Sequence, residues 1–195
     1  YQHSSNLTIK GNQITNNSSY GINLQSSCNY AVIDSNTVSG NNRGISIENS
    51  SNVSIINNGN VASGGSGYGT GGGIYLQYGS NALLENVIIT GNQGINGMVA
   101  GGITMVESAP KLQNVIIANN TTADKGGGMY LSDESNPALT HVTIVNNTAN
   151  NTGGGIRLHN SNPTLTNVTI ANNTANNGGG MYLNSANPIM TNSII

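Results

Sequence analysis

A motif of glycine followed by apolar-x-apolar occurs seven times along the 195 residues and constrains the fold more than any other feature. Successive motif glycines are 23 to 29 residues apart, and they are Gly21, Gly44, Gly73, Gly102, Gly128, Gly155 and Gly180. The apolar pair after each glycine, such as Ile156 and Leu158, has the period of two that is typical of a strand with one buried face. Short strands that return to the same place once per repeat predict a parallel β-solenoid, in which equivalent residues stack along the axis.

A second apolar-x-apolar pair lies between successive motif glycines, and an asparagine follows each of these pairs at a fixed distance. The asparagines stand five residues after the first member of the pair, and they are Asn12, Asn36, Asn58, Asn92, Asn120, Asn147 and Asn173. An asparagine that turns inward at a corner can form hydrogen bonds with the equivalent amides one coil above and below. A buried amide without partners is costly, so the pattern predicts that the seven side chains form one asparagine ladder.

Glycine-rich stretches such as 153–155 predict another corner, because glycine adopts positive φ and has no Cβ that could clash. From the motif glycine to the next ladder asparagine there are 14 or 15 residues in the first two coils and 18 or 19 in the later ones. We expect residues 1–195 to form one β-helix segment of a longer chain. Its expected parts are narrower coils at 1–58, an inserted loop at 59–72 and wider coils at 73–195.

The composition excludes several classes of function. Only 6% of the residues are charged and the net charge is −2, so the chain lacks the basic surface of a nucleic-acid-binding protein. No apolar run approaches the roughly 18 residues of a membrane span. The single cysteine, Cys28, excludes an internal disulfide and is interpreted as a small filler residue.

These residues resemble those of right-handed parallel β-helix proteins. The stretch "NLTIKGNQITNNSSYGINL" is similar to repeats of pectate-lyase-like enzymes and mannuronan epimerases. The stretch "NPTLTNVTIANNTANNGGGMY" resembles adhesin-type repeats of the chlamydial polymorphic outer-membrane kind, with Gly for Ala in their GGA motif and Ile for Phe in FxxN. The resemblance implies an all-β, single-stranded right-handed parallel β-helix of about seven coils. It also implies a location outside the cell or on the surface of a bacterium or archaeon.

Positions between the inward pairs are expected to face outward and supply candidate ligand-binding side chains. Tyrosine rings can stack on sugar rings, and arginine can donate hydrogen bonds to hydroxyl or carboxylate groups. The candidates in this column are Tyr75, Tyr130, Arg157 and Tyr182, and a further candidate, Tyr78, lies five residues after its motif glycine. The alternative interpretation is that these side chains cover the sheet and stack on one another.

Glu107 and Asp133 occupy equivalent positions on neighbouring coils, which places them about 5 Å apart. The β-helix lyases that the chain resembles use acidic groups to hold Ca²⁺ and a base to remove a sugar proton, and calcium binds six to eight oxygens. On this hypothesis Glu107, Asp133 and His159 are catalytic candidates, and Glu107 and Asp133 are the calcium ligands. The alternative is a solvated pair with no cofactor.

Two functions remain open, because the fold alone does not select between them. The first is a non-enzymatic surface, adhesin-type or structural β-helix that displays a binding face to a glycan, cell-surface or protein partner and stacks end to end with copies of itself. The low charge and the lack of a convincing catalytic constellation favour this function. The second is a polysaccharide lyase or epimerase that acts on uronate-containing glycans. The identity of the ligand stays open in both cases.

Overall fold

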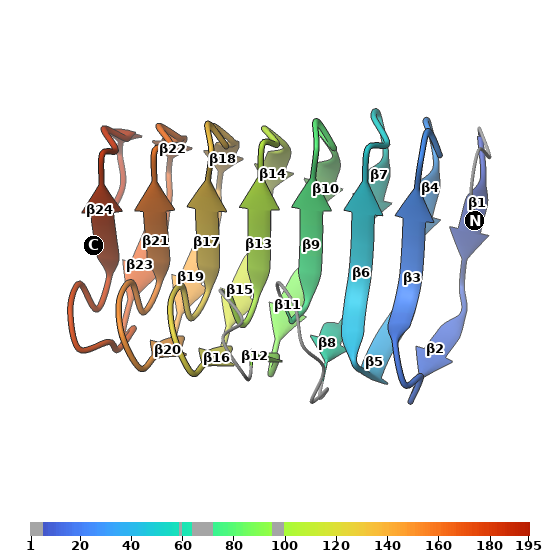
Figure 1. Ribbon diagram of the computed structural model, residues 1–195, viewed down its shortest axis with the longest axis horizontal. Coiled ribbons are helices and arrows are strands. Elements are labelled where there is room, and N and C mark those ends of the chain that lie inside the picture. The colour runs from blue at the N-terminus through green and yellow to red at the C-terminus, as the bar shows by residue number, and fades with distance from the viewer. Residues whose placement is uncertain (1–5, 59, 64–71, 95–99) are drawn as a thin grey trace.

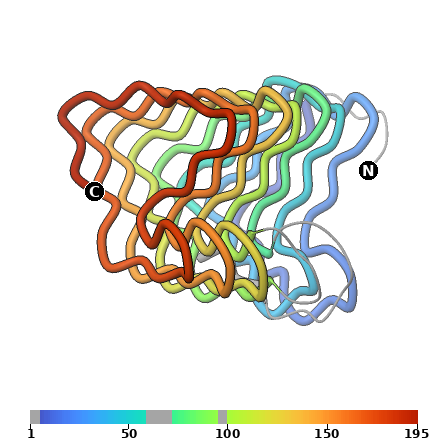
Figure 2. Tube along the Cα trace, turned by 60° about the vertical axis from the view of Figure 1, so that its left-hand side comes forward, coloured from blue at the N-terminus to red at the C-terminus, as the bar shows by residue number. Residues whose placement is uncertain are grey.

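The chain forms a solenoid of parallel β-strands. The computed structural model describes residues 6–58, 60–63, 72–94 and 100–195, and every regular element within these ranges is a strand. Figure 1 shows the coils side by side along one axis from the N-terminus to the C-terminus, and Figure 2 shows how each coil lies on the preceding one. The described ranges contain no helix able to cross a membrane. The predicted all-β parallel solenoid is confirmed.

Four parallel sheets run along the described part of the solenoid. Sheet 1 consists of β3 (Tyr20–Gln25), β6 (Arg43–Glu48), β9 (Ile74–Gln77), β13 (Ile103–Val106), β17 (Met129–Ser132), β21 (Ile156–His159) and β24 (Met181–Asn184). Sheet 2 consists of β1 (Thr8–Lys10), β4 (Val32–Asp34), β7 (Ser54–Ile56), β10 (Leu83–Glu85), β14 (Lys111–Gln113), β18 (Ala138–Thr140), β22 (Thr164–Thr166) and β25 (Ile189–Thr191). Between its first and last strands, sheet 1 spans six full turns of the chain.

The other two sheets complete the coil. Sheet 3 consists of β2 (Gln13–Thr15), β5 (Thr37–Asn41), β8 (Asn60–Ser63), β11 (Ile88–Thr90), β15 (Ile116–Ala118), β19 (Thr143–Val145) and β23 (Thr169–Ala171). Sheet 4 occurs in later coils and consists of β12 (Gln93–Gly94), β16 (Thr121–Thr122) and β20 (Thr148–Ala149). Strand β8 and the described residue Gly72 fall within the stretch predicted to be an inserted loop, and residues 59 and 64–71 of that stretch lie outside the described residues.

The interior holds the predicted files of aliphatic side chains. Ile156 and Leu158 are 1% and 0% exposed, and they lie in register with Met129 and Leu131 of the preceding coil. Complete burial of one such side chain stabilises the folded state by about 1.5–3 kcal/mol. Because each coil adds equivalent side chains, the core is continuous along the axis.

Each corner between sheets contains a residue with a left-handed backbone, and some corners after sheet 1 contain two, such as Asp133 and Glu134. The first left-handed residue after each strand marks the start of the turn. After sheet 1 these residues are Ser26, Asn49, Tyr78, Glu107, Asp133, Asn160 and Ser185; after sheet 2 they are Gly11, Ser35, Asn57, Asn86, Asn114, His141, Asn167 and Asn192. After sheet 3 they are Asn16, Gly40, Gly91, Asn119, Asn146 and Asn172. Glycine and asparagine tolerate this conformation better than other residues do. Many of the asparagines in the chain therefore occupy the left-handed positions at its corners.

The asparagine that follows many of these turning residues points inward and forms a ladder. Asn92 donates its backbone N–H and its Nδ2 to the Oδ1 of Asn120, at 3.0 and 2.8 Å. Asn120 Nδ2 also donates to the carbonyl of Ile89 in the coil below, at 3.0 Å. An amide in the middle of a ladder, such as that of Asn120, thus pairs with both neighbouring coils, as predicted.

The predicted single ladder of seven asparagines is nevertheless wrong, because the structure contains two ladders at two different corners. One joins Asn12, Asn36 and Asn58 after sheet 2, and the other joins Asn92, Asn120, Asn147 and Asn173 after sheet 3. Asn17 and Asn41 form the same kind of pair after sheet 3 in the early coils, at 2.7 Å. In the coil after Asn58, the equivalent position after sheet 2 is occupied by Val87. The backbone bonds show this equivalence, because Ile88 N–H donates to Asn58 O and Ile116 N–H donates to Val87 O in the same way.

The register of the strands explains this error. Ile55 pairs with Leu84 in sheet 2, whereas Ile89 pairs with Val61 of β8 in sheet 3. In the sequence, Ile55 and Ile89 occupy equivalent places, because each lies three residues before an asparagine of the pattern. In the structure they belong to two different sheets. The false equivalence arises because both corners use the same local sequence of an apolar pair, a turning residue and an asparagine.

One further column supports the corners. Ser50, Ser80, Ser108, Ser135 and Ser161 are buried and form a serine ladder after sheet 1, in which Ser80 N–H donates to Ser108 Oγ at 3.2 Å. Cys28 continues this ladder, because its N–H donates to Ser50 Oγ at 3.0 Å and its Sγ to the carbonyl of Gln25 at 3.2 Å. The thiol therefore takes the place of a ladder hydroxyl.

Candidate functional site

The predicted outward column on sheet 1 has the expected register but is less accessible than expected. Tyr75, Thr104, Tyr130 and Arg157 follow one another on adjacent strands. Tyr75 is only 5% exposed and Arg157 only 7%, while Tyr130 and Tyr182 are half-buried. Two of the five predicted ligand-binding side chains, Tyr75 and Arg157, are thus largely withdrawn from solvent.

Contacts among neighbouring coils account for this burial. The guanidinium of Arg157 lies 4.5 Å from the ring centre of Tyr182, and its Nη1 donates to the carbonyl of Leu158 at 2.6 Å. In the early coils Arg43 lies 5.1 Å from the ring of Tyr20 and 5.9 Å from that of Tyr75. Cation–π contacts of this kind use the same faces that a sugar ring would occupy.

The accessible candidates gather at the corner after sheet 1 instead. Glu107, Asp133, Glu134 and Asn160 line a depression of about 690 Å³, and Tyr78, which is 53% exposed, takes the equivalent turning position one coil before Glu107. We call these five residues the corner ridge. Three of the seven acidic residues of the chain lie in it. The left-handed turning positions bring these polar side chains together, because the chain turns there at the end of each sheet 1 strand.

The corner ridge combines groups that suit a polyhydroxylated ligand. Carboxylate and amide oxygens accept hydrogen bonds, and an exposed tyrosine ring offers an apolar face with a hydroxyl at its edge. Glu107 and Asp133, on neighbouring coils, line the same depression together with Glu134. His159, on β21, pairs in register with Ser132 and does not line the depression.

The ridge gives no sign of a built metal centre. Among the residues that the structure describes, no three His, Cys, Asp or Glu side chains form a group that could hold a metal ion. Calcium usually needs six to eight oxygens, so carboxylates on an open corner would have to draw the remaining ligands from water or from a bound ligand.

A carboxylate network on sheet 2 was not predicted from the sequence. Asp34 Oδ2 lies 2.6 Å from Lys10 Nζ, and Asp34 Oδ1 accepts hydrogen bonds from Ser35 at 2.7 Å and Asn57 at 3.3 Å. The hydrogen bond from Lys10, followed by that from Ser35, lowers the pKa of Asp34 from 3.8 to about 2. The spacing of 24 residues between Lys10 and Asp34, one coil length, was the available signal.

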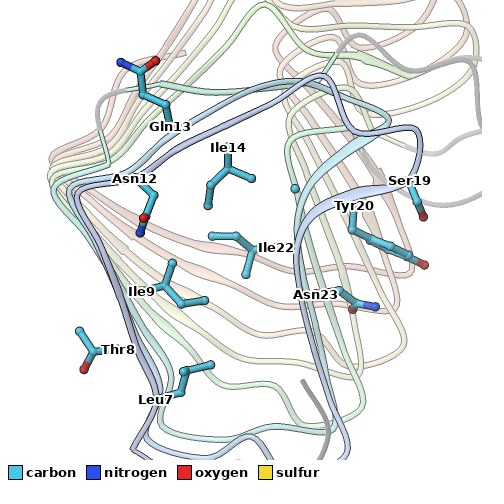
Figure 3. Close-up of a pocket in the computed structure, with 11 residues that line it drawn as sticks. Leu7, Thr8, Ile9, Asn12, Gln13, Ile14, Ser19, Tyr20, Ile22 and Asn23 are labelled. Atoms are coloured by element: carbon cyan, nitrogen blue, oxygen red, sulfur yellow. The ribbon is translucent and has the colours of Figure 1, made fainter.

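The two ends of the described solenoid expose apolar side chains. At the N-terminal end Leu7, Ile9, Ile14 and Ile22 line a depression of about 710 Å³, and Figure 3 shows these side chains pointing into it. At the other end Leu183, Ile189, Ile194 and Ile195 are 49% to 67% exposed.

The comparison with family models gives a match over the whole chain. A model described as "right handed beta helix region" matches residues 1–150 and 113–195. Comparison with curated proteins and with solved structures produced no match. The family model agrees with the parallel coils, the aliphatic files and the internal ladders described above. The chain therefore belongs to the right-handed β-helix family.

Proposed function

We propose that this β-helix is a non-enzymatic surface module that displays the corner ridge to a glycan partner outside the cell. The observation that carries the proposal is the accessible depression lined by Glu107, Asp133, Glu134 and Asn160, with exposed Tyr78 one coil away. Oxygen acceptors on successive coils repeat at about 4.8 Å, which suits hydroxyl groups that repeat along a polymer. The rigid stack of coils holds these groups in fixed positions without a ligand.

Glycan binding by ridge variants tests this proposal. Tyr78→Ala and the double variant Glu107→Gln/Asp133→Asn should weaken binding at least tenfold, the effect of about 1.4 kcal/mol. Tyr30→Ala is the matched control, because Tyr30 is 59% exposed and does not line the depression. Equal binding by the ridge variants and the Tyr30 control, on a glycan that the unaltered chain binds, would refute the role of the ridge.

A second candidate function is that of a polysaccharide lyase or epimerase acting on uronate-containing glycans. It is favoured by the carboxylates that neighbouring coils bring together, with Arg157 and His159 on the adjoining strand β21. Such an enzyme would use the carboxylates, with or without Ca²⁺, to hold the sugar. The test is the absorbance of unsaturated uronate products, or C5 epimerisation followed by NMR, on pectate and alginate with added calcium. Binding without either product supports the surface module.

We also infer that copies of the chain associate end to end. The apolar depression at one end and the exposed Leu183 and Ile189 at the other support this inference, since unpaired strand edges recruit further strands. Sedimentation over a range of concentrations should show assemblies that grow with concentration. Ile189→Lys should shift the distribution to monomers, and a concentration-independent monomer for the unaltered chain would contradict the inference.

A further inference from the structure

Three Asn–Gly pairs occur in the chain, at Asn58, Asn96 and Asn177. In such a pair the backbone nitrogen of the glycine can attack the side-chain amide carbon of the asparagine, because no Cβ hinders its approach. Asn96 and its glycine lie outside the described residues. Gly59 also lies outside the described residues, but Asn58 and Asn177 are both described and differ in their surroundings.

At Asn177 the two reacting groups are free. Asn177 and Gly178 are exposed, and among the hydrogen bonds of the described residues none involves the Asn177 side chain or the Gly178 N–H. The backbone of Asn177 is held on both sides, since its N–H bonds to Asn151 O and its carbonyl accepts from Gly153 N–H, each at 3.0 Å. The side chain alone is therefore available for reaction.

At Asn58 the amide is locked in place. The side chain is 0% exposed, and Nδ2 donates to the carbonyls of Ile33 and Ile56 at 2.8 and 2.9 Å. Its Oδ1 accepts from the backbone N–H of Asn36 at 2.9 Å. Any rotation of this amide would break all three hydrogen bonds, which requires local unfolding.

We propose that Asn177 is a site of spontaneous deamidation with water as the co-reactant. The deprotonated nitrogen of Gly178 forms a bond to Cγ of Asn177, and the side-chain nitrogen leaves as ammonia. Water then opens the five-membered succinimide ring at either carbonyl, which yields aspartate or isoaspartate without any oxidant or reductant. The reaction accelerates with rising pH, because the attacking nitrogen must lose its proton.

The product alters the contact between two coils. Isoaspartate inserts a methylene group into the backbone and adds a negative charge at the turn before β24. The bonds from Gly153 N–H to Asn177 O and from Gly154 N–H to Gly178 O, at 3.0 and 3.2 Å, then lose their alignment. Deamidation at this position therefore loosens the last described coil, which is independent of the proposed ligand-binding function.

Peptide mapping by mass spectrometry after incubation of the native chain at neutral and mildly alkaline pH tests the proposal. The native rate at Asn177 should lie within one order of magnitude of its rate in urea, whereas Asn58 should convert only in urea. Amide exchange at Gly153 and Gly154 should become faster in the converted fraction. Asn177→Thr is the matched control, because Thr152 occupies the equivalent position one coil earlier. If native Asn177 stays intact while the unfolded chain converts, the proposal is wrong.

Discussion

The side-chain oxygen of Asn147 accepts two hydrogen bonds from Asn120 in the preceding coil, one from its backbone N–H at 3.0 Å and one from its Nδ2 at 2.9 Å. Both residues are 0% exposed. One oxygen thus satisfies two buried donors that water cannot reach. This relationship repeats along each ladder and links the asparagine pattern of the sequence to the stability of the stack.

Replacement of Asn147 should reveal the strength of this link. Asn147→Val keeps a side chain of similar size, but it leaves the two donors of Asn120 unpaired. We expect a loss of about 3 kcal/mol in the free energy of unfolding. Urea unfolding measures it, with Asn150→Val, an exposed site, as the control that should change by about 0.5 kcal/mol or less. Equal effects of the two variants would contradict a ladder.

Substitutions of the turning residue beside the ladder should change the stability through the backbone conformation that they allow, and not through burial. Asn146 is exposed and has φ of 55°. Asn146→Gly should leave stability nearly unchanged, whereas Asn146→Val should cost about 1–2 kcal/mol, because a β-branched residue disfavours the left-handed region. Thermal and urea unfolding of the two variants provide the comparison, and a tolerated valine would show that the corner does not need this conformation.

Two glycines should differ in their tolerance of a methyl group. A Cβ on Gly128 would lie 2.6 Å from the carbonyl oxygen of Gly155 in the next coil, whereas Gly91 has a φ of 68° but open space around it. We expect Gly91→Ala to cost about 1–2 kcal/mol. Gly128→Ala should cost about 3 kcal/mol or more, because the coils must separate. A smaller effect at Gly128 than at Gly91 would contradict the close stacking of the turns.

Acid should weaken the network around Asp34. Because its pKa falls from 3.8 in the unfolded chain to about 2 in the folded chain, the carboxylate stabilises the fold above pH 3.8. That contribution should disappear as the pH falls from about 3.8 to about 2. Unfolding curves of Asp34→Asn and of the unaltered chain should therefore converge across this range. A carboxyl that titrates near 3.8 by NMR, or a gap between the two chains that stays constant with pH, would show that the contact with Lys10 does not form.

Much of the fold could be predicted from the sequence because stacked coils repeat their local chemistry. The motif glycines and the apolar pairs after them identify sheet 1, and Ile156 and Leu158 are buried as expected. Inward-pointing asparagines were also predictable, since a polar residue at a fixed place in each apolar repeat must find partners within the stack.

The register across residues 59–72 could not be predicted, for a physical reason. The corners after sheets 2 and 3 have the same requirements, a left-handed residue followed by an inward asparagine, and "INN" at 56–58 resembles "ANN" at 118–120. Only the hydrogen bonds between coils distinguish them. At the corner after sheet 2, the inward position is Asn58 in one coil and Val87 in the next. The local sequence contains no signal of this replacement of asparagine by valine.

The candidate site was predictable in part. The pairing of Glu107 with Asp133 follows from their equivalent places after the motif glycine, and the corner ridge contains both. The burial of Tyr75 and Arg157 was not predictable from alternation along a strand, because it depends on what packs over the outer face of sheet 1. Alternation assigns a side chain to a face, but it does not determine whether that face is open to solvent.

Engineered disulfides test the central claim, the stacking of each coil on its predecessor in the register described here. In a Cys28→Ser background, Ser54→Cys/Leu83→Cys places the two cysteines on directly paired residues of β7 and β10. Adjacent strands lie about 4.8 Å apart, within the roughly 4.4–6.8 Å between Cα atoms that a disulfide requires. This pair should therefore oxidise to an intramolecular cross-link, while Ser54→Cys/Ile88→Cys, which joins two different sheets, should not. A cross-link in the second pair and none in the first would contradict the account.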